Sequence, residues 1–227
     1  MVSAVIAAGG KGKRMGAGIN KVYLELRGKE ILARTLGVFQ SCEVIDEIVV
    51  VTGYEDIVSC RSIIERDGIT KVTAVSEGGK ERQESVYIGL SLAHGDVAVI
   101  HDGARCLVTD DEIRSVVADA EKYGAAALGV KVKDTLKTID ESGNITATVN
   151  RERTVQIQTP QVFDRLELMD LHERLKKEGG AVTDDCSVLE RYGRSVHFTP
   201  GKYENIKITT PEDMIMGERI LEMRESK

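Results

Sequence analysis

Short runs of consecutive apolar residues recur along this chain, and segments with helical spacing separate them. Apolar runs at residues 2–8, 48–51, 72–75, 97–100 and 125–132 predict strands. Because these runs are almost continuously apolar, the strands should be buried on both faces, as the strands of parallel sheets are. The alternation of strands and helices favours an α/β fold with a doubly wound, mostly parallel, Rossmann-like sheet.

The helices are predicted from the spacing of their apolar positions and from their end signals. Thr210 followed by Pro211 and Asp213 is typical of a helix start, with Thr210 as the N-cap. Further helices are predicted at residues 31–39, 56–66, 83–93, 110–122, 164–177 and 187–192, and short strands at 196–199 and 205–209.

The regular alternation stops after residue 132. Residues 136–139 and 145–149 read as two strands around a turn at 141–144, which predicts a protruding β-hairpin arm at about residues 133–157. Two strands alone are only marginally stable, so the apolar face of the arm needs a cover. A second copy of the chain is the simplest cover, and we expect a homodimer. The whole chain, residues 1–227, is expected to be a single domain.

Composition excludes several classes of protein. The net charge of −6 argues against a nucleic-acid partner. Apolar runs are shorter than the roughly 20 residues of a membrane span, and there is no signal-peptide pattern, so a cytoplasmic protein without membrane contact is expected. The widely spaced cysteines favour reduced thiols over a disulfide or zinc framework; they are Cys42, Cys60, Cys106 and Cys186.

The charge is unevenly distributed. Residues 1–29 contain six basic side chains and one acidic side chain, in a chain that is acidic overall. Three of these six cations lie in a glycine-rich loop, residues 7–15, which directly follows the first predicted strand. Glycines let the backbone approach a ligand, and the cations suit a polyphosphate. The loop has neither the P-loop spacing nor the G-x-G-x-x-G spacing of dinucleotide folds, so a nicotinamide-dependent oxidoreductase is disfavoured.

Two further motifs follow strands. Residues 78–86 begin with two glycines and lead into a predicted helix. The free N–H groups at the start of a helix favour an anion. Gly79 leaves room for a flat base beside the backbone, and Ser85 offers a hydrogen bond. Asp102 and Arg105 follow the strand at 97–100, at the edge where ligands bind in α/β sheets. Asp102 could hold Mg²⁺ and Arg105 could hold a phosphate. His101 beside them is expected to be structural.

Several polar residues later in the chain would each be typical of a protein surface if taken alone; they are Arg151, Thr159, Thr183 and Lys207. Taken together with the motifs above, and in their order along the chain, they resemble the 2-C-methyl-D-erythritol 4-phosphate cytidylyltransferases. The resemblance covers nearly the whole chain. The motifs that carry it are residues 7–15 with Lys21, 79–86, 101–105, 132–135, 158–161, 183–185 and 205–211. Asn20 departs from the pattern, because many members of that family have proline there.

The resemblance implies a nucleotidyltransferase fold and a set of nucleotide contacts. It assigns Arg14 and Lys21 to stabilising the transition state at the triphosphate. It implies that CTP is bound by Ala7, Ala8, Gly9, Gly79, Lys80 through its backbone, Ser85 and Ala104.

The resemblance also implies a second substrate, 2-C-methyl-D-erythritol 4-phosphate, and Mg²⁺ held by Asp102. Some contacts would come from the arm of the partner copy. The implied substrate-binding residues are Asp102, Arg105, Thr135, Arg151, Thr159, Thr183 and Lys207.

The implied reaction joins the cytidylyl group of CTP to the sugar phosphate and releases pyrophosphate, in the non-mevalonate pathway of isoprenoid biosynthesis. Two alternatives remain open on the sequence. One is a cytidylyltransferase for another polyol phosphate, such as ribitol 5-phosphate. The other is a non-catalytic nucleotide-binding regulator on the same fold, which the presence of both Arg14 and Lys21 argues against.

Overall fold

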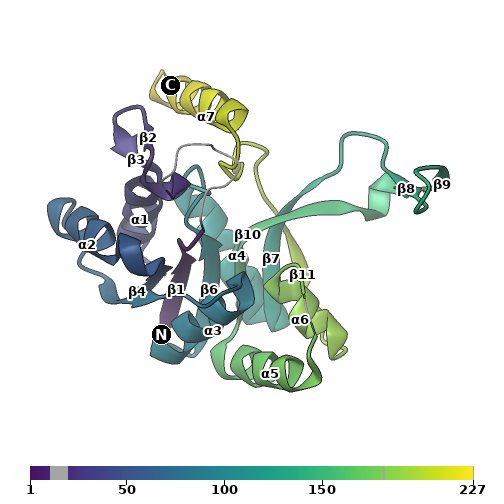
Figure 1. Cartoon of the computed structure of the whole chain (residues 1–227), viewed down its shortest axis with the longest axis horizontal. Helices are drawn as coiled ribbons and strands as arrows, with labels where there is room; N and C mark the ends of the chain where they lie inside the picture. Colours follow the sequence, from purple (N-terminus) through teal and green to yellow (C-terminus); the bar gives the residue numbers. More distant parts are fainter. Residues whose placement is uncertain (11–19, 181, 227) are drawn as a thin grey trace.

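A computed structural model describes residues 1–10, 20–180 and 182–226 of the chain. A seven-stranded sheet lies at its centre, in the order β11-β7-β10-β6-β1-β4-β5 (Figure 1). Neighbouring strands are parallel except at β10, which runs antiparallel to both β6 and β7. The strands of this sheet are β1 (Val2–Ala7), β4 (Glu47–Thr52), β5 (Val72–Glu77), β6 (Val97–Asp102), β7 (Ala125–Lys131), β10 (Val155–Asp164) and β11 (His197–Pro200).

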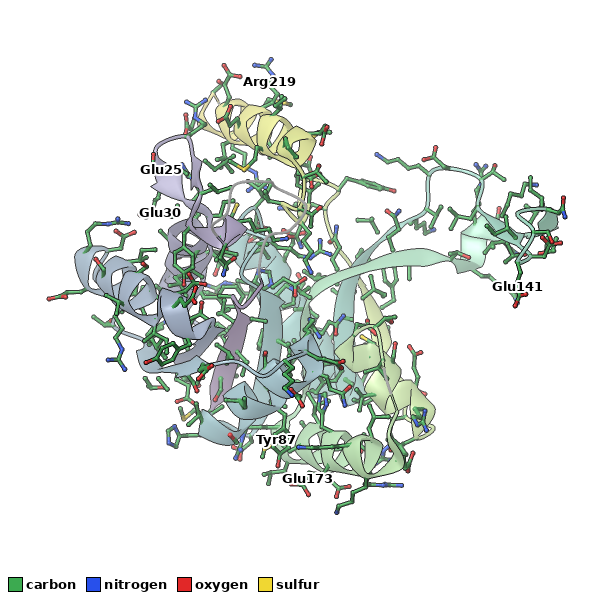
Figure 2. The ribbon with its side chains drawn as sticks, viewed as in Figure 1. Glu25, Glu30, Tyr87, Glu141, Glu173 and Arg219 are labelled. Carbon is green, nitrogen blue, oxygen red and sulfur yellow. The ribbon has the colours of Figure 1, made fainter. Side chains whose placement is uncertain are left out.

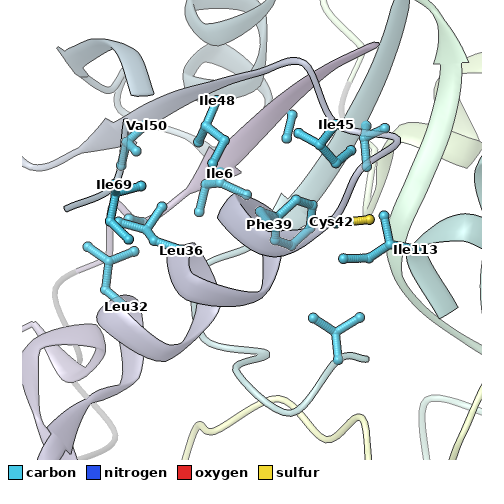
Figure 3. Close-up of a cluster of buried hydrophobic side chains, with 14 of the residues drawn as sticks. Ile6, Leu32, Leu36, Phe39, Cys42, Ile45, Ile48, Val50, Ile69 and Ile113 are labelled. Atoms are coloured by element: carbon cyan, nitrogen blue, oxygen red, sulfur yellow. The ribbon is translucent and has the colours of Figure 1, made fainter. Parts of the chain in front are cut away.

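Helices cover both faces of the sheet, which confirms the predicted doubly wound architecture. Side chains of a strand alternate between faces, so Ile6 packs with α1, α2 and α4 while Val5 packs with α3, α5 and α6. Figure 3 shows the first of these cores, where Leu36 and Phe39 face Ile6. The helices are α1 (Ile31–Ser41), α2 (Ile57–Arg66), α3 (Arg82–Leu92), α4 (Asp110–Tyr123), α5 (Arg165–Glu178), α6 (Asp185–Arg191) and α7 (Pro211–Glu225).

Polar contacts at the surface join helices on the same face. Tyr87 of α3 donates a hydrogen bond to Glu173 of α5 at 2.6 Å, and Figure 2 shows the two side chains together at that edge. The predicted start of α7 is confirmed, because Thr210 and Asp213 cap it reciprocally. None of the helices in the described part of the chain combines the length and apolar character that a membrane span requires.

Strand β10 is absent from the sequence prediction. Its residues 158–163 are buried in the middle of the sheet. The whole strand contains three glutamines and Pro160, and a proline within a run argues against a central strand. Pro160 is tolerated because the pairing of β10 with β7 is irregular between Ile157 and Gln161.

The predicted strand at residues 205–209 is wrong. This segment is irregular, although the Ile208 N–H donates to the Ala104 carbonyl at 2.9 Å. Ile208 is fully buried beside Leu26, in the small core under α7. The apolar spacing that suggested a strand therefore reflects packing beneath a helix. Leu26 belongs to a short hairpin, β2 (Glu25–Leu26) and β3 (Lys29–Glu30), which the sequence analysis did not predict.

The predicted hairpin arm is confirmed. Strands β8 (Lys137–Ile139) and β9 (Ile145–Thr148) pair antiparallel, and the arm extends away from the rest of the chain (Figure 1). Ile139 and Ile145 are about two-thirds exposed, at 66% and 67%. The arm thus presents apolar side chains that nothing in the described chain covers.

Candidate active site

A cleft of about 1180 Å³ opens at the carboxyl ends of β1, β4 and β5 and at the start of α3. Ligands of doubly wound sheets bind at this edge, and small-molecule sites usually occupy about 300–1,000 Å³. Five of the predicted nucleotide-binding residues line the cleft: Ala7, Gly9, Gly79, Lys80 and Ser85.

Two other residues predicted to bind nucleotide, Ala8 and Ala104, are buried. The Ala8 carbonyl accepts a hydrogen bond from Asn20 Nδ2 at 2.8 Å, and the Ala104 carbonyl accepts one from the Ile208 N–H. In this structure both alanines therefore hold neighbouring segments in place through their backbones.

The loop before α3 is held by the first turn of that helix. The Gly79 N–H donates to Ser85 Oγ at 3.1 Å, and the Lys80 N–H donates to Glu84 Oε2 at 2.7 Å. A side chain at position 79 would meet Glu84 Cβ at 2.3 Å, so only glycine fits there. In this structure the Lys80 N–H is thus paired with the Glu84 carboxylate.

Of the two predicted catalytic cations, the structure describes only Lys21. Arg14 lies outside the described residues. Lys21 is the first residue of η1 (Lys21–Tyr23), a 3₁₀ helix whose N-cap Asn20 lines the cleft. Lys21 therefore directly follows a residue of the cleft wall.

Asp102, at the end of β6, lies among three cationic side chains. Its Oδ2 is 2.7 Å from Lys207 Nζ and 3.7 Å from Arg105 Nε, and its Oδ1 is 3.4 Å from Arg82 Nε. We call these four residues the Asp102 cluster. Burial by itself raises the pKa of the Asp102 carboxyl, but attraction to Lys207 and Arg82 outweighs it and holds this pKa well below its usual range.

Behind Asp102, Thr159 and His101 form a buried hydrogen-bonded chain. The Asp102 N–H donates to Thr159 Oγ1 at 3.1 Å, and Thr159 Oγ1 lies 3.0 Å from His101 Nδ1. His101 Nε2 is 3.2 Å from the Arg105 carbonyl. Burial lowers the pKa of His101 to about 3, so the ring is neutral and supports the cluster.

Arg82 is a site residue that sequence reasoning missed. It lines the cleft, contacts Asp102, and places Nη1 2.7 Å from Oδ2 of Asp185, the first residue of α6. Asp185 is buried, and its other oxygen is 3.2 Å from His172 Nε2. Burial raises the pKa of Asp185, but Arg82 and His172 produce a net lowering. The signal was present in the sequence, because Arg82 and Asp185 both lie within the motifs already singled out.

The segment that carries Lys207 is fastened to other site residues. Arg105 Nη1 donates to the Asn205 carbonyl at 2.8 Å, and Asn205 Nδ2 donates to the Thr159 carbonyl at 3.0 Å. The structure therefore brings together four predicted substrate-binding residues that are far apart in the sequence; these are Asp102, Arg105, Thr159 and Lys207.

Three predicted substrate-binding residues lie elsewhere. Thr183 is exposed just before α6, with its hydroxyl 3.4 Å from Ser187 Oγ. Thr135 and Arg151 are exposed on the arm, before β8 and in η3 (Arg151–Arg153). The arm projects away from the sheet edge that carries the Asp102 cluster (Figure 1), so within one chain these two do not join it.

The side chains of this site suit a metal ion only if a bound ligand supplies further oxygen atoms. Within the residues that the structure describes, no group of three or more His, Cys, Asp or Glu side chains is placed to hold a metal. Mg²⁺, however, is commonly held by one or two carboxylates and by substrate phosphates. The single Asp102 carboxylate fits that pattern if a nucleotide supplies the other oxygens.

The chain is similar to known proteins over nearly its whole length. Residues 2–223 match the sequence profile of the family described as 2-C-methyl-D-erythritol 4-phosphate cytidylyltransferase. Proteins of that name from Clostridium botulinum strain 657 and Desulforamulus reducens are 50% and 43% identical, over 222 and 226 residues. These matches cover 97% and 98% of this chain, and 97% of each relative.

A solved structure shares the fold. It is 4-diphosphocytidyl-2C-methyl-D-erythritol synthase from Anaerococcus prevotii, with a TM-score of 0.88 and 31% identity. The match covers 98% of this chain and 96% of that chain. The match therefore spans the segments of this chain that form the cleft, the Asp102 cluster and the arm.

Proposed function

The chain belongs to the 2-C-methyl-D-erythritol 4-phosphate cytidylyltransferase family, and from this premise we propose how its residues divide the reaction between them. The enzyme transfers a cytidylyl group from CTP to 2-C-methyl-D-erythritol 4-phosphate, a step of isoprenoid biosynthesis that yields 4-diphosphocytidyl-2-C-methyl-D-erythritol and pyrophosphate. In our proposal the cleft binds CTP and the Asp102 cluster binds the sugar phosphate. The supporting observation is that Arg82 both lines the cleft and contacts Asp102.

The nucleophile is a phosphate oxygen of the second substrate. It attacks the α-phosphorus of CTP in line with the leaving pyrophosphate, so one P–O bond forms as another breaks. A phosphate monoester has a second pKa of about 6 and is mostly dianionic at neutral pH, so no general base is required. A buried, neutral His101 is compatible with this chemistry, since it needs only to hold Thr159 and the backbone of Arg105.

The chemical difficulty is electrostatic, because two polyanions must meet. Cations that are already held in place stabilise the charge that develops in the transition state, because little free energy is spent on moving them during the reaction. In our proposal Arg14 and Lys21 act at the triphosphate, and Arg105 and Lys207 act at the sugar phosphate. Thr159 supports the second pair from behind, and Thr183 is a lesser contact near Asp185.

Nucleotide selection is proposed for the loop before α3. Gly79, the Lys80 N–H and Ser85 would contact cytosine, and Ala7 and Gly9 would line the rest of the nucleotide site. The buried Ala8 and Ala104 would support that site through their backbones. The cleft-facing positions of Gly79, Lys80 and Ser85 support this assignment.

We propose that Mg²⁺ accompanies CTP and that Asp102 contributes a carboxylate oxygen to it. The ion would neutralise phosphate charge as the two substrates meet. Because Lys207 and Arg82 now contact the Asp102 carboxylate, at least one of them would turn from it toward a substrate phosphate.

We propose a homodimer in which the arm of one copy packs against the other. The exposed Ile139 and Ile145 and the two-stranded arm support it, because such a hairpin gains stability only when its apolar face is covered. In that assembly Thr135 and Arg151 would reach the sugar phosphate in the partner's site. Residues 1–227 would act as one catalytic domain, with residues 133–157 as its arm.

A cytoplasmic location is proposed from the cysteines. All four are buried and unpaired, which suits a reducing compartment. Cell fractionation with an antibody to this chain tests the proposal, and recovery of the protein in a membrane or secreted fraction would contradict it.

The activity is tested by pyrophosphate release from CTP, 2-C-methyl-D-erythritol 4-phosphate and MgCl₂. We expect turnover with CTP and 2-C-methyl-D-erythritol 4-phosphate. The kcat/KM should be much lower when ribitol 5-phosphate replaces 2-C-methyl-D-erythritol 4-phosphate, or when UTP replaces CTP. Faster turnover of ribitol 5-phosphate would reassign the second substrate. Omission of Mg²⁺ in the presence of EDTA should abolish turnover if the proposed metal is required.

A further inference from the structure

Asn20 uses its whole side-chain amide to fasten the segment that carries Lys21. The residue is 8% exposed and caps η1 through Oδ1, which accepts from the Val22 N–H at 3.4 Å. Its Nδ2 donates to the Ala8 carbonyl at 2.8 Å and to Asp56 Oδ2 at 2.9 Å. One buried side chain thus joins three segments of the cleft wall.

Those partners are themselves fixed to the sheet. The Ala8 N–H donates to the Val51 carbonyl at 2.7 Å, which ties the end of β1 to β4. Asp56 ends η2 (Tyr54–Asp56), the short helix that follows β4. The bonds of Asn20 therefore relate the start of η1 to the ends of two adjacent parallel strands.

A second attachment holds the other end of η1. Tyr23 Oη lies 2.9 Å from Thr52 Oγ1 and donates to the Asp56 carbonyl at 3.3 Å. With Asn20 on one side of Lys21 and Tyr23 on the other, the backbone of Lys21 is fixed at both ends of a single helical turn. Little rotation of this turn is possible unless one attachment breaks.

We propose that Asn20 is a positioning residue for Lys21, which fixes the lysine backbone relative to the nucleotide cleft. The inference rests on the proposed role of Lys21 at the triphosphate. A cation that acts mainly in the transition state must be held to within about 0.5 Å, whereas ground-state binding of CTP has many other contacts. Loss of the Asn20 bonds should therefore lower kcat more than it changes the KM for CTP.

The test is a double-mutant cycle of Asn20→Ala and Lys21→Ala, with kcat and both KM values measured for each variant. We expect Asn20→Ala to lower kcat about 10-fold or more while the KM for CTP changes less than about 3-fold. In the Lys21→Ala background the same substitution should change kcat less than about 2-fold, because the group that it positions is gone. Equal effects in both backgrounds would overturn the proposal, and so would wild-type kcat for Asn20→Ala.

Controls separate positioning from folding and from the proposed function itself. Asp164→Ala removes the N-cap of α5, whose Oδ1 accepts from the Glu167 N–H; Asp164 pairs with Val97, at the opposite end of β6 from Asp102. We expect it to lower Tm without lowering kcat. If Asn20→Ala does not fold, Asn20→Ser retains a capping oxygen for Val22 and removes both Nδ2 bonds, and the same cycle is run with it. A wild-type kcat for Lys21→Ala would refute the proposed role of Lys21 itself. Additive effects of the two substitutions, with a low kcat for Lys21→Ala, would refute only the positioning role of Asn20.

Discussion

Lys207 Nζ lies 2.7 Å from Asp102 Oδ2, although one residue belongs to an irregular segment before α7 and the other ends a central strand. The contact exists because Asn205 and Arg105 fasten the Lys207 segment to the end of β6. The Asp102 carboxylate thus holds Lys207 at the end of β6. In the proposed reaction, the sugar phosphate would take over a cation that is already in place.

Replacing Lys207 tests its proposed contact with the sugar phosphate. Lys207→Ala should raise the KM for 2-C-methyl-D-erythritol 4-phosphate about 10-fold or more, since a charge-assisted hydrogen bond contributes about 1.5–3 kcal/mol. The KM for CTP should change little. Lys202→Ala is the matched control, because Lys202 is an exposed lysine of the same segment. Equal increases in both KM values for Lys207→Ala would contradict the assignment.

Arg14 and Lys21 are proposed to stabilise the transition state. Arg14→Ala and Lys21→Ala should each lower kcat by about 10² or more, which is typical for loss of a preorganised charge partner. Arg27→Ala is a control from the same basic segment, because Arg27 pairs with Glu225 of α7 rather than with the cleft. Steady-state kinetics with kcat near the wild-type value for both variants would refute this role.

A charged substitution on the arm tests the proposed contact between two copies of the chain. Ile145→Lys should convert the proposed dimer to a monomer in light scattering, because a buried lysine without a partner is costly. Activity should fall with it, since Arg151 would no longer reach the partner's site. Ile215→Lys is the control, because Ile215 on α7 is 71% exposed and lies outside the arm. A dimer that persists in Ile145→Lys, or a wild type that is monomeric, would refute the arm interface.

The ion pair between the buried Asp185 and the partly exposed Arg82 should matter for stability. Breaking a fully buried pair typically costs about 3–5 kcal/mol of unfolding free energy. Because Arg82 is 29% exposed and keeps Asp102 as a second counter-charge, Asp185→Ala should cost less than that range but more than an exposed pair does. Urea unfolding measures the change. Asp170→Ala, which breaks an exposed pair with Arg174 on α5, should have no measurable effect. Similar small losses in both variants would mean that the pair between Arg82 and Asp185 is dispensable.

Glu47 should make the protein sensitive to acid. Its buried carboxylate accepts hydrogen bonds from Ser3 Oγ and from the N–H groups of His94 and Gly95. Burial raises the pKa of Glu47, but these bonds outweigh it and lower the pKa to about 2 from 4.5. The carboxylate thus adds about 3 kcal/mol of stability above pH 4.5, lost as the pH falls toward 2.

Urea unfolding of the wild type and of Glu47→Gln, measured between pH 6 and pH 3, tests that assignment. The stability of the wild type should decline more steeply below pH 4.5 than that of Glu47→Gln. Parallel curves for the two proteins would show that Glu47 does not carry the pH dependence.

Much of the fold could be predicted because each local signal agreed with the tertiary environment. The apolar run at 48–51 is buried on both faces of β4, as its composition required. The failures occur where a neighbour outweighs the local signal. Residues 158–163 form a central strand despite Pro160, since β6 and β7 lie on both sides, and Ile208 is buried under α7 rather than in the sheet.

The sequence by itself determined the alternating α/β architecture, the capped start of α7 and the arm, because each depends on periodicity or on a short motif. Only the tertiary structure decided that Arg82 bridges Asp102 and Asp185, and that Asn20 ties η1 to the ends of two strands. The reason is physical: the strength of an ion pair or a hydrogen bond depends on distance and burial. Both are set by the packing of segments that lie far apart in the chain.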